Sequence, residues 1–191
     1  MKFIFATANQ HKAKEARSIL GPKIQLLLPT DLGYALEIPE TGNTLEDNAM
    51  QKARTIWSFY GLPCFADDTG LEVLALGGAP GIFSARYAGA HANMQANLAK
   101  LLDQLRGKED RRAQFRCVIA LILNGKEFFF EGSVSGHILE TPQGGYGFGY
   151  DPVFVPQGYD RSFALMSEQE KNAVSHRGRA LEQLAHFLNL S

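Results

Sequence analysis

The segment 2-KFIFATANQHKAKEARSILGPKIQLLL-28 decides the fold class of this 191-residue chain. Its first part, 2–7, has the apolar character of a strand. The segment 11–20 then has the pattern of a helix, which Gly21 ends. A second apolar run, 24–28, follows at once. The chain therefore opens strand–helix–strand, an order that predicts an α/β protein.

The rest of the chain alternates in the same way. Thr44 is the expected N-cap of a helix that Gly61 ends, Asn124-Gly125 predicts a hairpin turn, and Ser167 with Glu170 has the spacing of a capping box. We expect helices at 45–60, about 91–105 and within 167–190, and strands near 63–66, 113–123, 126–132 and 134–139. The pattern predicts a mixed sheet rather than a purely parallel one, in a single domain over residues 1–191 without a separable linker.

Composition excludes several classes of protein. Apolar residues make up 45% and charged residues 20% of the chain, as in ordinary soluble proteins, and the net charge is −1. This balance argues against a nucleic-acid or membrane partner, so an anionic ligand must be met by local cations or a metal. No apolar run approaches the roughly 20 residues that span a bilayer, and the start is too short for a signal peptide. We therefore expect a cytoplasmic protein with Cys64 and Cys117 reduced.

The segment 7-TANQHK-12 lies where the first strand turns into the first helix. Such a turn presents backbone N–H groups and the positive end of the helix dipole, which together bind phosphate. Thr7 and Asn9 add donors, and Lys12 adds a charge. The alternative is that Asn9 only caps the helix. The segment is not a P-loop, because it lacks the G-x-x-x-x-G-K-[ST] pattern.

Carboxylates follow in two segments, Glu40 in 39-PETG-42 and Asp67-Asp68 after the short strand. Mg²⁺ prefers one or two carboxylates together with phosphate oxygens and water. Neighbouring side chains at a strand end point to opposite faces, so the two Asp residues are expected to have different roles. The alternatives are a solvated loop residue for Glu40 and turn-forming Asp residues before Gly70.

Two further segments could contact a nucleotide. The loop 144-GGYGFGYDP-152 carries aromatic rings that could stack on a base, although it could equally be a structural turn. Lys171 and 175-SHRG-178 place donors near a helix start, unless they are ordinary surface charges. The histidines have no metal-ligand spacing, so zinc is not expected.

Taken together, five segments resemble the motifs of the Ham1 family of inosine/xanthosine triphosphate pyrophosphatases, in the same order and over residues 3 to about 188. They are 7-TANQHK-12, 66-ADDTG-70, 77-GGAPGIFSARYAG-89, 147-GFGYDPVF-154 and 170-EKNAVSHRGRAL-181. The resemblance implies Mg²⁺-dependent hydrolysis of ITP, dITP or XTP to the monophosphate and pyrophosphate. It also implies a homodimer whose subunit is an elongated mixed sheet with helices on both sides and two lobes around a central cleft.

The resemblance further implies a role for each matching residue. Glu40 and Asp68 would bind Mg²⁺, and Asp68 would also accept a proton, while Asp67 on the opposite face would support the site. The other implied contacts are with the substrate: Thr7, Asn9 and Lys12 would hold the triphosphate, and Phe148, Gly149, Tyr150, Asp151, Lys171, His176 and Arg177 would hold the nucleoside. The further residues implied to contact the substrate are Ala8, Gln10, His11, Lys52 and Thr69. One departure is Ala8, where many relatives have Gly, and Gln10-His11 is also an uncommon choice.

Selectivity would follow from the carbonyl oxygen at position 6 of hypoxanthine and xanthine. Donors such as His176 and Arg177 would pair with that oxygen and would stay unpaired against adenine. Two other functions are compatible with the sequence: a catalytically silent nucleotide-binding or sensor protein on the same fold, and a pyrophosphatase acting on modified pyrimidine nucleotides.

Overall fold

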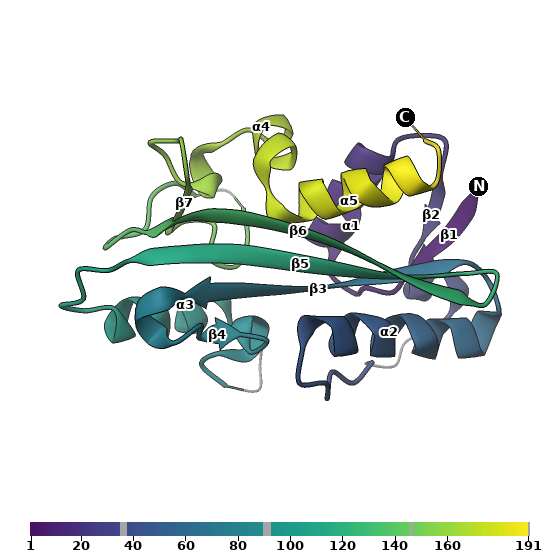
Figure 1. Cartoon of the computed structure of the whole chain (residues 1–191), viewed down its shortest axis with the longest axis horizontal. Helices are drawn as coiled ribbons and strands as arrows, with labels where there is room; N and C mark the ends of the chain where they lie inside the picture. Colours follow the sequence, from purple (N-terminus) through teal and green to yellow (C-terminus); the bar gives the residue numbers. More distant parts are fainter. Residues whose placement is uncertain (35–37, 90–92, 146, 191) are drawn as a thin grey trace. The chain divides into compact units, whose positions relative to one another are not determined.

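The computed structural model describes residues 1–34, 38–89, 93–145 and 147–190 (Figure 1). Its strands are β1 (Lys2–Phe5), β2 (Gln25–Leu27), β3 (Cys64–Val73), β4 (Pro80–Gly81), β5 (Arg112–Leu123), β6 (Lys126–Ile138) and β7 (Phe154–Pro156). Its helices are α1 (Gln10–Leu20), α2 (Leu45–Tyr60), α3 (Met94–Gln104), α4 (Glu168–Val174) and α5 (His176–Phe187), with short 3₁₀ turns between some of them. None of the helices in these ranges combines the length and the apolar character needed to cross a membrane.

The strands form one mixed sheet in the order β2-β1-β3-β5-β6-β7, with β4 paired to β3. The first strand, β1, runs parallel to both β2 and β3, whereas β4 is antiparallel to β3 and β7 is antiparallel to β6. The predicted α/β fold with a mixed sheet is therefore confirmed.

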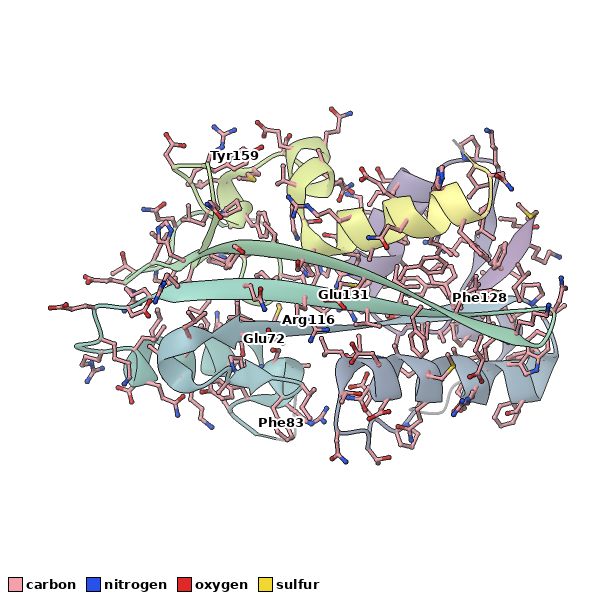
Figure 2. All side chains as sticks on the ribbon, viewed as in Figure 1. Glu72, Phe83, Arg116, Phe128, Glu131 and Tyr159 are labelled. Carbon is pink, nitrogen blue, oxygen red and sulfur yellow. The ribbon has the colours of Figure 1, made fainter. Side chains whose placement is uncertain are left out.

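The chain divides into two compact units, each with its own apolar core. Unit 1 comprises Met1–Asp68, Cys117–Gly132 and His176–Ser191, and unit 2 comprises Thr69–Arg116 and Ser133–Ser175. In unit 1, α1 and α5 pack on the sheet, and the Phe5 and Phe65 rings stack with centroids 4.6 Å apart. Also in unit 1, Phe128, labelled in Figure 2, packs against Phe187.

The core of unit 2 is built around aromatic side chains. Phe115 and Phe154 meet edge to face with ring centroids 4.7 Å apart, and Phe163 packs against both. At partly exposed positions of the same unit, Glu72 lies beside Arg116 of β5, with the two charged groups 3.4 Å apart (Figure 2). Each unit thus buries a separate group of apolar side chains.

Local capping signals located several element ends correctly. The Thr44 hydroxyl accepts from the backbone N of Asp47 at 3.0 Å, and Gly61 ends α2 in the left-handed conformation with φ 60°. The capping box of Ser167 and Glu170 forms at the start of α4. These signals act within one turn of the chain, so the sequence displays them directly.

Three predictions about element boundaries were wrong. The strand expected near 63–66 continues through both Asp residues to Val73, so these residues lie within β3 and are not turn formers. Gly70 lies within the strand, and its position faces the backbone of β4. An added Cβ would lie 2.9 Å from the Gly81 carbonyl oxygen, so the position has no room for a side chain.

The strands expected at 126–132 and 134–139 are one strand, β6, which passes through Gly132. The helix expected within 167–190 is two helices, because the backbone of Ser175 is extended, with ψ 155°. The start of the helix predicted from residue 91 and the ring of Tyr146 lie outside the described residues.

Candidate active site

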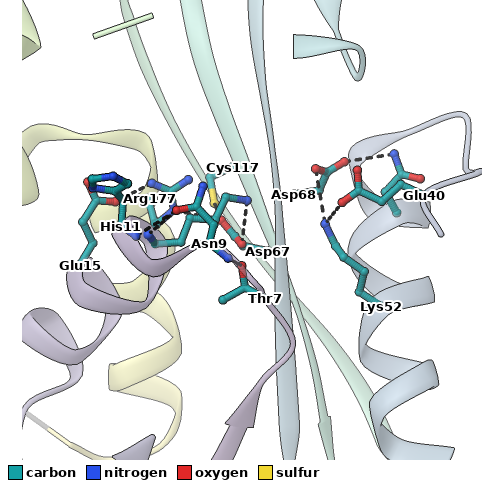
Figure 3. A network of polar contacts seen from close by, with 12 residues as sticks. Thr7, Asn9, His11, Glu15, Glu40, Lys52, Asp67, Asp68, Cys117 and Arg177 are labelled. Carbon is teal, nitrogen blue, oxygen red and sulfur yellow. Dashed lines mark hydrogen bonds and ion pairs between the residues drawn. The ribbon is translucent and has the colours of Figure 1, made fainter. Parts of the chain in front are cut away.

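Two groups of polar side chains lie on opposite sides of β3, one around Asp67 and the other around Asp68 (Figure 3). Both carboxylates are buried, at 2% and 7% exposure, although each carries a charge that burial disfavours. The alternation of side chains along a strand separates them, as expected from their adjacent positions. Each carboxylate must therefore be stabilised by a different set of partners.

The Asp67 carboxylate binds two cations, one with each oxygen. Its Oδ1 accepts from Lys12 Nζ at 3.0 Å, and its Oδ2 accepts from Arg177 Nε at 2.9 Å. Arg177 also donates through NH1 to Glu15 Oε2 at 2.5 Å. Burial by itself would raise the pKa of Asp67, but Lys12 and Arg177 outweigh burial and hold that pKa well below its usual range. Asp67 is thus ionised in the folded protein.

The turn before α1 holds Lys12 in place by ordinary helix capping. Asn9 Oδ1 accepts from the backbone N of His11 at 2.9 Å and of Lys12 at 3.3 Å, and the backbone N of Asn9 donates to Thr7 Oγ1 at 3.1 Å. The alternative that Asn9 caps the helix is therefore correct as a statement of structure. This cap does not test the predicted contact of the turn with phosphate, which stays a prediction.

The Asp68 side has a different balance of charge. Lys52 Nζ lies 3.6 Å from Asp68 Oδ1 and also donates to Glu40 Oε1, and Asn48 Nδ2 donates to Asp68 Oδ2 at 3.1 Å. Burial raises the pKa of Asp68 and Glu40 adds to that rise, although Lys52 and Lys12 oppose it. Burial would lower the pKa of Lys52, but the two carboxylates raise it instead. Two carboxylates therefore share one ammonium group.

This donor set fits a magnesium ion better than a transition metal. The described residues contain no cluster of three or more His, Cys, Asp or Glu side chains that could enclose a metal. Mg²⁺ does not need such a cluster, because it keeps several waters and binds one or two carboxylates beside substrate phosphates. Glu40 and Asp68 both contact the Lys52 ammonium, so these two carboxylates are directed toward the same cation.

Unit 2 contains a second cluster of predicted site residues. Lys171 Nζ donates to Asp151 Oδ2 at 2.8 Å and lies over the Phe148 ring, 4.6 Å from its centroid. Asp151 Oδ2 also accepts from the backbone N of Phe148 at 2.9 Å. Tyr150 faces the core of this unit, with 5% of its surface exposed and its hydroxyl donating to the Ser84 carbonyl oxygen. Of the two rings described in this loop, that of Phe148 is therefore the partly exposed one.

The remaining predicted residues vary in exposure. Ala8, Gln10 and His11 are exposed, Thr69 and Gly149 are partly exposed, and His176 is buried. Among the described residues, the non-glycine positions in the left-handed region are Asn124 and Asn189, so Ala8 needs no conformation reserved for glycine. Arg177 is 2% exposed and binds two carboxylates, so base recognition by its guanidinium stays a prediction.

Two residues of these groups were absent from the predicted site. Asn48 lies one helical turn before Lys52, so the i, i+4 spacing on α2 could have indicated that both face Asp68. Glu15 gives no comparable signal, because its partner Arg177 is 162 residues away in the sequence.

Comparison with known proteins identifies close relatives over the full chain. The model of the Ham1 family matches residues 3–187. The chain is 49% identical to the dITP/XTP pyrophosphatase of Christiangramia forsetii, over 99% of this chain and 100% of that protein. It is 52% identical to the dITP/XTP pyrophosphatase of Porphyromonas gingivalis, over 98% and 97% of the two chains. A solved Ham1 protein from Coxiella burnetii is 40% identical and superposes with a TM-score of 0.91, covering 100% of both chains.

Proposed function

The chain belongs to the Ham1 family, and on that premise we propose that it is a nucleoside-triphosphate pyrophosphatase. Its substrates are deaminated purine nucleotides, dITP, ITP and XTP, which it hydrolyses to the monophosphate and pyrophosphate. The observation that supports this most directly is the convergence of Glu40 and Asp68 on the Lys52 ammonium. One or two carboxylates beside substrate phosphates are what Mg²⁺ usually binds, and a bound Mg²⁺ can assist attack on a phosphate.

In this proposal Glu40 and Asp68 hold Mg²⁺, which when bound supplies Lewis-acid stabilisation of the polyphosphate charge. Asp68 also orients the attacking water and accepts its proton. Without the metal, burial and the nearby Glu40 raise the pKa of Asp68, and a bound Mg²⁺ would favour its ionised form, which is the form that binds a metal and accepts a proton. Asn48 fixes the carboxylate by donating to Oδ2, leaving Oδ1 on the side of Lys52.

The triphosphate is held by the turn before α1. Thr7 and Asn9 shape that turn by accepting from its backbone N–H groups, the positive end of the helix dipole attracts phosphate oxygens, and Lys12 supplies a positive charge. Lys52 contributes a second ammonium group beside the carboxylates, and Thr69 follows Asp68 directly in the chain. These local charges explain how a chain with a net charge of −1 can bind a polyanion.

We assign the nucleoside to residues of the 147–151 loop together with Lys171, His176 and Arg177. Phe148 offers a partly exposed ring, and Lys171 and Asp151 offer a donor and an acceptor held 2.8 Å apart. His176 and Arg177 are the proposed donors to the oxygen at position 6 of the base. If Arg177→Ala leaves the ratio of kcat/KM for ITP over ATP unchanged, that assignment is wrong.

The test is a panel of nucleotides assayed for pyrophosphate release by the purified protein with Mg²⁺. We expect dITP, ITP and XTP to be cleaved with kcat/KM at least about 100-fold above ATP, because donors that face position 6 would stay unpaired against the amino group of adenine. Guanine also carries an oxygen at position 6, so these donors alone would not reject GTP, and its rate is measured separately. Preferential cleavage of modified pyrimidine triphosphates would favour the pyrimidine-directed alternative. Binding of ITP without release of pyrophosphate would instead identify a silent sensor.

Two further properties belong to the same proposal. We expect a homodimer in solution, which light scattering after gel filtration would test against a mass of 21.0 kDa for one chain. We also expect the protein to act in the cytoplasm, where nucleotide precursors are found and where Cys64 and Cys117 would stay reduced.

A further inference from the structure

Four charged side chains, three of them buried, form a line of ion pairs that joins three separate segments of unit 1. Lys12 and Glu15 come from α1, Asp67 from β3 and Arg177 from the first turn of α5. The charges alternate in the order Lys12, Asp67, Arg177, Glu15, so two cations balance two anions. A buried ion pair often gives little net stability compared with apolar residues of the same volume. These ion pairs are therefore better explained by the positions in which they hold the four side chains.

Asp67 is the centre of this geometry because each of its oxygens has a different cation. Arg177 binds Oδ2 and is itself held by Glu15 on its other side, so the plane of the Asp67 carboxylate is fixed. Oδ1 then sets the position of the Lys12 ammonium at 3.0 Å. An ammonium has three N–H donors, and the Lys12 side chain is 16% exposed. Binding Asp67 with one donor therefore still allows it to donate to a phosphate oxygen.

We infer that Asp67 is a positioning residue for pyrophosphate release, which holds the Lys12 ammonium where it meets a phosphate oxygen of the triphosphate, while Arg177 and Glu15 hold Asp67. This inference rests on the proposed function, in which Lys12 contacts the triphosphate. Asp67 itself contacts neither substrate nor metal. Its contribution reaches the reaction through Lys12, and fixed placement of such a charge matters most in the transition state.

The substitution Asp67→Asn tests whether the Asp67 carboxylate positions the Lys12 ammonium or only fills the space beside it. The amide of this variant has one acceptor oxygen where the carboxylate has two, and Lys12 and Arg177 lie on different oxygens, so without rearrangement it can accept from only one of the two cations. Arg177 is 2% exposed and Lys12 is 16% exposed, so Lys12 is the cation that can turn away. We expect Asp67→Asn to lower kcat/KM for dITP by about 10–100-fold, the cost of misplacing a group by about 1 Å.

The decisive experiment is a double-mutant cycle on kcat/KM with Lys12→Met. If Asp67 acts through Lys12, Asp67→Asn should lower kcat/KM by less than about 3-fold in the Lys12→Met background, because the group it positions is already gone. An equal fall in both backgrounds would overturn the inference. Asp110→Asn is the matched control, because Asp110 also binds a guanidinium, that of Arg112, but at the surface of unit 2. It should leave kcat/KM unchanged in both backgrounds.

A second variant covers the case in which Asp67→Asn does not fold, and the activity of the wild-type protein separates this inference from the proposed function. If Asp67→Asn does not fold, the same cycle is run with Asp67→Glu, which keeps the charge but moves the carboxylate by one methylene. The same coupling to Lys12 is expected, and its absence would overturn the inference equally. A wild-type protein that releases no pyrophosphate from any nucleotide of the panel would overturn the proposed function and this inference with it. Equal falls in an active enzyme would overturn the inference alone.

Discussion

The two sides of β3 carry neighbouring carboxylates in opposite electrostatic situations. On one side, Asp67 and Glu15 are matched by Lys12 and Arg177, so two anions meet two cations. On the other side, Glu40 and Asp68 share Lys52, so two anions meet one cation. The pKa of Asp67 is held below its usual range, whereas burial raises the pKa of Asp68.

This difference in charge balance corresponds to different roles: Asp67 supports the structure of the site, and Asp68 takes part in the reaction. The Asp67 group pairs two anions with two cations, and Asp67, Glu15 and Arg177 are buried, whereas the Lys12 side chain is 16% exposed. The Asp68 group has a surplus of one negative charge among these residues, which a bound divalent cation would compensate. Adjacent positions on one strand can thus serve different tasks, because each side of the strand meets a different helix. Four substitutions test that division.

Asp68→Asn should have the largest effect, and it should be on activity. We expect turnover of dITP to fall by about 10²–10⁴-fold, the usual contribution of a positioned base, with a further loss from weaker metal binding. Stability should change little, because the raised pKa of Asp68 means that folding already disfavours its charge. Pyrophosphate release and the Tm in EDTA would be measured together. A variant that keeps a tenth of wild-type turnover would contradict the division.

Asp67→Asn should act on stability where Asp68→Asn does not. Removing one partner of a buried ion pair typically costs about 3–5 kcal/mol, because the other charge is left uncompensated. We expect a loss of that size in the free energy of unfolding, measured by urea titration of the metal-free protein near pH 7. A loss as small as that of Asp68→Asn would show that the two sides are equivalent.

The pH dependence of that loss has a definite sign. The pKa of Asp67 is lower in the folded protein than its unfolded value of about 3.9, so the unfolded state binds more protons as the pH falls below about 4. The stability that the Asp67 charge contributes is therefore present above about pH 4 and is lost below it. The gap between wild type and Asp67→Asn should be constant from pH 7 to 5 and should narrow below pH 4.

Gly132→Ala tests whether the Asp67 side depends on the close approach of α5 to the sheet. A Cβ at this position would press against the His176 carbonyl oxygen and would lie 2.6 Å from the backbone N of Ala180. We expect a loss of about 1–3 kcal/mol, as for other overpacked positions, because α5 must move away with Arg177. Gly145→Ala is the control, since nothing lies within 4 Å of its Cβ. An equal Tm for the two variants would count against this dependence.

The sequence predicted the features that act within a few residues. The limits of α2 follow from Thr44 and Gly61, and the capping box of α4 follows from Ser167 and Glu170. The extent of β3 did not follow, because Asp-Asp-Thr-Gly has the local chemistry of a turn. Pairing with β4 and neutralisation by distant cations override that preference. The continuity of β6 through Gly132 also depends on a distant element, the backbone of α5.

The same distinction applies to the candidate site. Glu40 and Asp68 were predicted to bind one metal and Lys52 to contact the substrate, and the structure places both carboxylates beside the Lys52 ammonium. The partnership of Glu15 with Arg177 was not predicted, because no pattern along the chain relates residues 162 positions apart. What local patterns identify is the residue type and the element that carries it. Which charges neutralise one another is set by the packing of α1, β3 and α5.

Glu127→Gln should have the smallest effect, and it shows why burial decides the comparison. Glu127 binds Arg54 through two hydrogen bonds of 2.7 Å, shorter than the 3.0 Å between Lys12 and Asp67. Its side chain is nevertheless 38% exposed and that of Arg54 is 63% exposed. Water and salt screen such a pair, so we expect a loss of no more than about 1 kcal/mol and unchanged kcat/KM. If Glu127→Gln cost as much as Asp67→Asn in the same urea titration, short distance rather than burial would govern the ion pairs of unit 1.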